Sequence, residues 1–204
     1  MAHEGLWEQL VELDERETAR RAKCQYITNP ERYVLTLLNT DYVVSLSNRQ
    51  IFSVQPESEP TSAEFLEQLC ILAYLINAKD VPLADKLVRA ETLRGGQFFF
   101  RGLHSLPTEK LEEVFGQCHD KLFDVAEQFG AERRNFGDAS IQLYVLPRIP
   151  ITIVIWRGDE QFAARASVLF DQSAADQLPL DALLAAVNLT VDALAKAAQT
   201  GASD

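Results

Sequence analysis

The stretch SIQLYVLPRIPITIVIW, residues 140–156, decides the fold class. β-Branched and aromatic residues dominate it, and Pro147-Arg148 interrupts it, so it predicts two strands over 140–146 and 149–156. A third run, 162–170, follows Arg157-Gly158-Asp159-Glu160, which is typical of a hairpin connection. These residues therefore predict an antiparallel strand block over about 140–170.

A second strand block is predicted much earlier in the chain, over about 32–54. Residues 33–38 and 42–46 are two β-prone runs around the polar turn Asn39-Thr40-Asp41, and 51–54 is a short third strand. Helical patterns separate the two blocks, without the regular strand–helix alternation of a parallel sheet. We therefore expect an α+β fold in which the two blocks build one antiparallel sheet covered by helices.

Helices are predicted in the remaining segments. Apolar residues at steps of three and four predict an amphipathic helix over 5–23. Thr61 and Glu64 form a capping-box pattern before a helix that is apolar on every side after Leu69, and a shorter helix is expected through Leu87 and Val88. Further helices are expected over 111–129 and in the alanine-rich segment that ends near Ala198. We expect a single domain over 1–204, the alternative being two lobes divided near 78–97.

The composition limits the classes of partner. The chain has 204 residues, 47% of them hydrophobic, which excludes a disordered chain, and a net charge of −11. Such a charge repels phosphate backbones and anionic lipids, so we expect neither nucleic acid nor a membrane as a partner. The longest apolar runs reach about half of the roughly twenty residues that a membrane-spanning helix needs.

The cysteines and the first residues indicate a compartment. Cys24, Cys70 and Cys118 are isolated, and an odd number of cysteines cannot form a closed disulfide framework. The first twenty residues are acidic and periodic, unlike an export signal. We therefore expect a cytoplasmic protein.

The segment FFFRGLHSLP, residues 98–107, is the densest aromatic stretch, and we expect it to pack inward as a loop. His104 then lies at the edge of an apolar cavity, where its imidazole could ligate a metal centre. A planar macrocycle such as a corrinoid or haem suits a cavity walled by Phe99, and Arg101 is a cation for its carboxylates. The alternative is a histidine bonded to a backbone carbonyl.

Three further residues are candidates for the same cofactor site. Trp156 and Arg157 end a predicted strand, where rigid scaffolds often present binding groups. Arg148 lies between two prolines, which suits either a bulge between strands or a contact to an anion. Asp159 and Glu160 could form an acid and base pair, although adjacent carboxylates at a hairpin tip are usually solvated turn residues.

The segments FFFRGLHSLP (98–107), LPRIPI (146–151), WRGDE (156–160), LFD (169–171) and LP (178–179) resemble a family known as a domain of unknown function in anaerobic and metal-reducing bacteria. The resemblance covers residues 15–195. In that family the domain is sometimes fused to an iron–sulfur cluster module, which implies a role near anaerobic redox or corrinoid-linked one-carbon metabolism. This chain lacks the run of cysteines that holds a cluster, and the family supplies no catalytic residues to transfer.

Three hypotheses on function follow from the sequence. The first is a binding or accessory domain that accommodates an apolar cofactor such as a corrinoid or haem near His104. The second is an enzyme that uses Asp159, Glu160 or His104 on a small anionic substrate held by arginines. The third is a protein-interaction module with no small ligand. Phosphate-binding glycine loops, zinc-ligand spacings and hydrolase motifs are all absent from the sequence.

Overall fold

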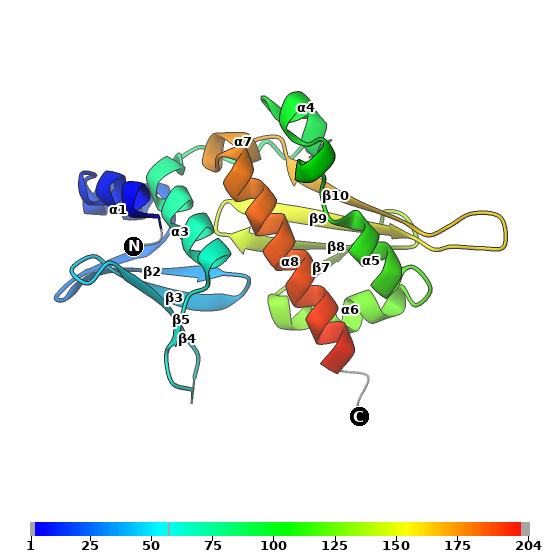
Figure 1. Cartoon of the computed structure of the whole chain (residues 1–204), viewed down its shortest axis with the longest axis horizontal. Coiled ribbons are helices and arrows are strands. Elements are labelled where there is room, and N and C mark those ends of the chain that lie inside the picture. Colours follow the sequence, from blue (N-terminus) through cyan, green and yellow to red (C-terminus); the bar gives the residue numbers. More distant parts are fainter. Residues whose placement is uncertain (1–2, 57, 201–204) are drawn as a thin grey trace.

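The later strand block forms the three inner strands of a five-stranded antiparallel sheet, called here the second sheet (Figure 1). The computed structural model describes residues 3–56 and 58–200. The strand order is β6-β10-β9-β8-β7. The strands are β6 (Leu87–Arg89), β7 (Glu132–Arg134), β8 (Ala139–Leu146), β9 (Ile149–Trp156) and β10 (Arg165–Asp171). β9 is central and buried throughout except at Trp156, which explains its nearly continuous apolar sequence.

The earlier block forms the first sheet, also antiparallel, in the order β1-β2-β3-β4-β5. Its strands are β1 (Gln25–Thr28), β2 (Glu31–Leu37), β3 (Thr40–Ser45), β4 (Gln50–Val54) and β5 (Thr61–Ser62). Leu38 and Asn39 connect β2 to β3, and both have positive φ, at 48° and 61°. A two-residue hairpin turn requires such backbone angles, so the turn lies one residue earlier than the polar sequence indicated.

The α+β class and the antiparallel pairing are confirmed, but the two blocks form two sheets and not one. The amide of Leu38 donates to the carbonyl of Val145 at 3.0 Å, which joins the first hairpin to β8. Buried apolar residues of both sheets belong to one continuous core. Strand patterns give the period of each block, but they do not determine whether two sheet edges pair or pack side by side.

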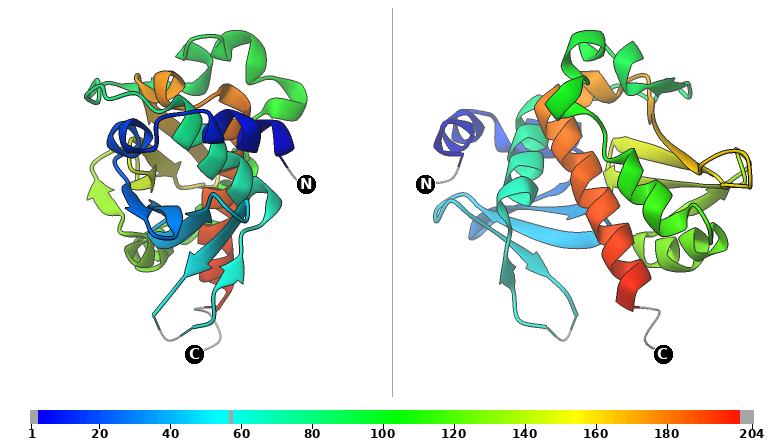
Figure 2. Two further views of the ribbon diagram at one scale, coloured as in Figure 1. Left: turned by 90° about the vertical axis from the view of Figure 1, so that its left-hand side faces the viewer. Right: turned by 45° about the vertical axis from the view of Figure 1, so that its right-hand side comes forward.

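Helices link the two sheets (Figure 2). They are α1 (Glu4–Val11), α2 (Glu15–Arg21), α3 (Phe65–Asn77), α4 (Gly96–Phe99), α5 (Thr108–Phe115), α6 (Asp120–Ala126), α7 (Ala174–Gln177) and α8 (Leu180–Thr200). α8 packs against α3 on one side and against α5 and α6 on the other. α3 is buried all round from Cys70 to Leu75, as its sequence predicted.

Three local predictions are wrong. The expected helix over 5–23 is broken into α1 and α2, because the Asp14 carboxylate accepts the Glu17 N–H at 2.7 Å and starts a new helix. The capping box of α3 is formed by Glu64 and Glu67, while Thr61 lies in β5. The expected helix through Leu87 and Val88 is the edge strand β6, which pairs with β10.

Residues 78–86, where the alternative lobe boundary was expected to begin, contain neither helix nor strand and lead from α3 to β6. Within the described residues, no helix combines the length and apolarity needed to cross a membrane.

Candidate functional site

The segment 98–107 does not pack inward as expected. Phe98 is 80% exposed and Leu103 is fully exposed, so these side chains wall no cavity. Phe100 is buried in the core, where its ring lies 6.5 Å from that of Phe170, while Phe99 and Leu106 are partly buried against the core. Gly96–Phe99 forms the short helix α4 and Gly102–His104 a 3₁₀ turn, and these two elements project from the body of the molecule (Figure 1).

His104 is exposed, and its imidazole stacks on the ring of Phe99 at a centroid distance of 4.6 Å and an interplanar angle of 3°. A hollow of about 420 Å³ lies nearby beside Phe100, Ser105 and Leu106, but His104 is not among the residues that line it. Arg101 lies over Phe98, with its guanidinium carbon 5.9 Å from the ring centre. The structure thus brings Phe99, Arg101 and His104 together on a surface and not in a cavity.

Arg148 is buried and is held by the protein itself. Its guanidinium donates to the carbonyls of Arg21 at 2.6 Å and Val81 at 3.0 Å, and it forms an ion pair with Asp80. The preceding strand has a register irregularity between Tyr144 and Leu146. Leu146 pairs with Ile149, so Arg148 itself lies in the two-residue turn between β8 and β9 and not in the bulge, and its guanidinium is already engaged with protein acceptors.

Trp156 and Arg157 lie at the opposite end of β9 from Arg148. At about 3.3 Å per residue, roughly 25 Å separates Trp156 from Arg148. Arg157 is exposed, and its amide donates to Asp138. The six residues predicted to bind a cofactor are thus not all in one site.

Asp159 is a turn residue. Its carboxylate accepts the amides of Gln161 and Phe162, both at 2.8 Å, and these hydrogen bonds lower the pKa of Asp159 below its ordinary value. A carboxyl group with a lowered pKa is ionised at neutral pH and does not serve as a general acid.

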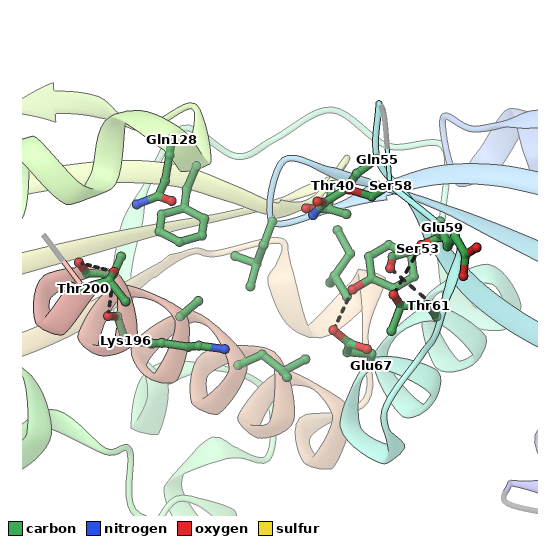
Figure 3. Close-up of a pocket in the computed structure, with 17 residues that line it drawn as sticks. Thr40, Ser53, Gln55, Ser58, Glu59, Thr61, Glu67, Gln128, Lys196 and Thr200 are labelled. Atoms are coloured by element: carbon green, nitrogen blue, oxygen red, sulfur yellow. Dashed lines mark hydrogen bonds between the residues drawn. The ribbon is translucent and has the colours of Figure 1, made fainter.

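A cleft of about 550 Å³ lies elsewhere, between the first sheet, the start of α3 and the last turns of α8 (Figure 3). Its polar lining residues are Thr40, Ser53, Gln55, Ser58, Glu59, Thr61, Glu67, Gln128, Lys196 and Thr200. Apolar wall is contributed by Leu37, Leu38, Phe129, Leu189, Ala193 and Ala197, along with Tyr42. This volume is within the range of small-molecule sites.

A row of hydroxyl groups crosses the first sheet at this cleft. Tyr42 pairs with Ser53, and Ser53 pairs with Thr61, so the three side chains stand on the same face of neighbouring strands. Directly opposed side chains in such a ladder have Cβ atoms about 5 Å apart. The same face carries the buried Val44 and Ile51 one step further along. The sheet face therefore changes from apolar to hydroxyl-bearing where it meets the cleft.

The Glu67 carboxylate is fixed by two donors. The Tyr42 hydroxyl donates to Glu67 Oε1 at 2.6 Å, and the backbone amide of Glu64 donates to Oε2 at 2.7 Å. Burial, together with the neighbouring Glu67, holds the pKa of Tyr42 far above its ordinary value, so the phenol keeps its proton and remains a donor. A sheet residue thus orients a carboxylate that lines the cleft.

Lys196 brings the opposite charge from α8. Its side chain extends along the helix toward the part of the cleft where Glu67 lies (Figure 3). Within residues 3–56 and 58–200 the ammonium group has no hydrogen bond or ion pair. It is therefore available to an anionic group in the cleft.

Within residues 3–56 and 58–200, no three or more His, Cys, Asp or Glu side chains lie close enough together to hold a metal ion. The three cysteines are free thiols, and burial raises the pKa of the Cys24 and Cys70 thiols to about 12. These two thiols are thus unreactive at neutral pH.

Sequence reasoning missed the cleft. One signal was present in the inward-facing positions of the two strands. Those of β3 are Val44, Tyr42 and Thr40, and those of β4 are Ile51, Ser53 and Gln55. In both strands the side chains change from apolar to polar toward the same end of the sheet. The contribution of α8 had no comparable signal, because Lys196 on an alanine-rich helix is indistinguishable from a solvated surface lysine.

Comparison with known proteins gives one match. The family model described as "Domain of unknown function (DUF3786)" matches residues 14–193. No curated protein and no solved structure matches the chain.

Proposed function

The chain belongs to the DUF3786 family of domains of unknown function, and we propose that it is a binding or accessory domain that holds a small polar ligand in the cleft between the first sheet and α8. The observation that carries the proposal is the hydroxyl row of Tyr42, Ser53 and Thr61, which replaces apolar side chains on the inner sheet face at the cleft. Few, well-placed polar groups in a partly apolar hollow are typical of ligand sites.

The charges of the cleft support a ligand that is not a polyanion. Among the described residues that line the cleft, Glu59 and Glu67 face one cation, Lys196, on a chain with a net charge of −11. Nucleotides would be repelled, and the carboxylates of a tetrapyrrole would lack cationic partners here. The hydroxyl and amide groups favour a ligand with hydrogen-bonding groups of its own.

A thermal-shift screen of the full chain against small polar metabolites tests the proposal. A ligand at 100 times its dissociation constant stabilises a protein by about 2.7 kcal/mol. Ala193→Phe introduces a large side chain into the cleft wall and should abolish the shift, whereas Gln199→Phe, on an exposed position of the same helix that does not line the cleft, should retain it. A shift that survives Ala193→Phe, or the absence of any stabilising compound, contradicts the proposal.

A corrinoid or haem bound through His104 is the second candidate. The exposed imidazole, presented on the ring of Phe99 and beside Arg101, is the observation that favours it, since an axial ligand must be accessible. A role in anaerobic redox or one-carbon metabolism belongs to this candidate. Titration with haem or cobalamin should then give a spectral shift that His104→Ala abolishes, and no shift with either compound would exclude it.

We also place the protein in the cytoplasm as part of this proposal. The three free cysteines support a reducing compartment, because no disulfide connects them.

A further inference from the structure

We propose that the ligand of the cleft is a small zwitterion that carries both an ammonium and a carboxylate group, as a free amino acid does. The inference rests on the proposed function of the cleft and specifies the class of its ligand. Its basis is the placement of Glu67 and Lys196, one carboxylate and one ammonium, in the wall of a single cleft with no ion pair between them.

Glu67 is suited to hold the ammonium group. Each of its oxygens accepts one hydrogen bond, from the Tyr42 hydroxyl and from the Glu64 amide, so the carboxylate is fixed before a ligand arrives. A carboxylate offers about four lone-pair sites, and two of them remain for a ligand's N–H donors. Preorganisation of this kind reduces the ordering cost of binding.

Lys196 is suited to hold the carboxylate group. It comes from a different element, α8, and it provides three N–H donors that no described residue uses. In Figure 3 its ammonium lies between the Thr200 end of the cleft and the Glu67 end. A ligand that bridges the two groups neutralises both charges.

The apolar part of the cleft wall can contact the side chain of such a ligand. Leu189, Ala193 and Phe129 line the cleft alongside the charged groups, so a side chain of modest size has apolar contacts available. A simple amine satisfies only Glu67, and a simple acid satisfies only Lys196. Glu59, which also lines the cleft, adds a second negative charge and further disfavours ligands with more than one acidic group.

Isothermal titration calorimetry of the full chain with each of the standard amino acids tests the inference. For the tightest amino acid, the decarboxylated amine and the deaminated acid serve as half-molecules, and each should bind at least tenfold more weakly. Glu67→Gln should weaken the amino acid and the amine at least tenfold but leave the acid unchanged. Lys196→Met should weaken the amino acid and the acid at least tenfold but leave the amine unchanged.

The variants have matched controls. In Glu67→Gln the amide oxygen can accept from the Glu64 amide, which preserves the capping box, and the amide NH2 can donate to the Tyr42 hydroxyl oxygen. Glu67→Gln should therefore retain the far-UV circular dichroism of the parent, and its melting temperature is measured alongside each affinity. Glu113→Gln on α5 and Lys86→Met in the 78–86 segment remove the same charges from exposed positions outside the cleft and should leave every affinity unchanged.

The outcomes separate this inference from the proposed function. If a neutral hydroxylated compound binds in a manner that Ala193→Phe abolishes, with equal affinity in Glu67→Gln and Lys196→Met, the cleft is a ligand site but the zwitterion is wrong. If no amino acid binds, or if binding is unaffected by both charge variants, the inference is overturned.

Discussion

The guanidinium of Arg148 donates a hydrogen bond from Nε to the backbone carbonyl of Arg21 at 2.6 Å, which joins the β8–β9 turn of the second sheet to the last turn of α2. The same guanidinium reaches Asp80 and the carbonyl of Val81. Three segments far apart in the sequence therefore meet at one buried cation, and its role is to hold the α2 end, the 78–86 segment and the second sheet together.

Replacing Arg148 by methionine should destabilise the fold by about 2–4 kcal/mol, because it removes three hydrogen bonds of a buried guanidinium and the ion pair with Asp80. Urea unfolding followed by tryptophan fluorescence measures the loss. Arg157→Met, at an exposed position near the other end of β9, should change the unfolding free energy by less than about 0.5 kcal/mol. Equal effects of the two substitutions would show that Arg148 is not a structural clamp.

Acid should weaken the fold in part through Asp171. Burial alone would raise its pKa, but the Ser173 hydroxyl and the amides of Ala84 and Ser173 donate to the carboxylate and lower the pKa below the ordinary 3.8. The stabilisation that the ionised Asp171 gives to the fold is therefore fully present above about pH 4. It is lost as the pH falls through the pKa that Asp171 has in the folded protein, which lies below 3.8. Urea midpoints between pH 6 and pH 3 should show the advantage of the parent over Asp171→Asn shrinking as the pH falls. A constant difference would contradict this assignment.

Gly137 should not tolerate a side chain. Its φ is +58°, and a Cβ there would lie 2.6 Å from the Ile155 carbonyl oxygen and 2.8 Å from Val154. Gly102 has nearly the same φ, +57°, but open space around the same position. Gly102→Ala should therefore cost only the backbone strain, about 1–2 kcal/mol, and Gly137→Ala should cost more. The difference between the two melting temperatures measures the cost of the steric clash at Gly137. Equal shifts would show that the Ile155 carbonyl and Val154 move away from the added Cβ.

The three consecutive phenylalanines should differ sharply in their contribution to stability. Phe100→Ala should cost about 3–5 kcal/mol, because that ring is buried against Phe170. Phe98→Ala should change the unfolding free energy by less than about 0.5 kcal/mol, because that ring is 80% exposed. Chemical denaturation of both variants tests the pattern. A large cost at Phe98 would indicate that the side chain is covered in solution.

Local periodicity allowed much of the fold to be predicted. The runs at 140–146 and 149–156 correspond to β8 and β9 almost residue for residue, because a central strand must be apolar on both faces. The all-round apolar pattern after Leu69 likewise identified α3 as a buried helix. Short edge strands were not predicted. Leu87–Arg89 has only three residues, and it is a strand because it pairs with β10.

The candidate site could not be predicted in the same way. The aromatic density of 98–107 indicated burial, but composition does not say which of three adjacent rings faces inward: Phe100 is buried, Phe99 is partly buried and Phe98 is exposed. The cleft is assembled from β2 to β5, α3, the 3₁₀ turn Glu127–Phe129 and α8, and its two opposite charges, Glu67 and Lys196, are far apart in the sequence. Such a site becomes visible only when the packing of α8 against α3 is known.

The position of α8 also bears on biosynthesis. Its buried residues extend from Ala182 to Ala198, and they fill the space between α3 and the α5–α6 pair. A ribosome must therefore translate beyond Ala198, and release that segment from its exit tunnel, before the interior can close. Until then the nascent chain exposes the apolar sides of three helices, a state that chaperones bind.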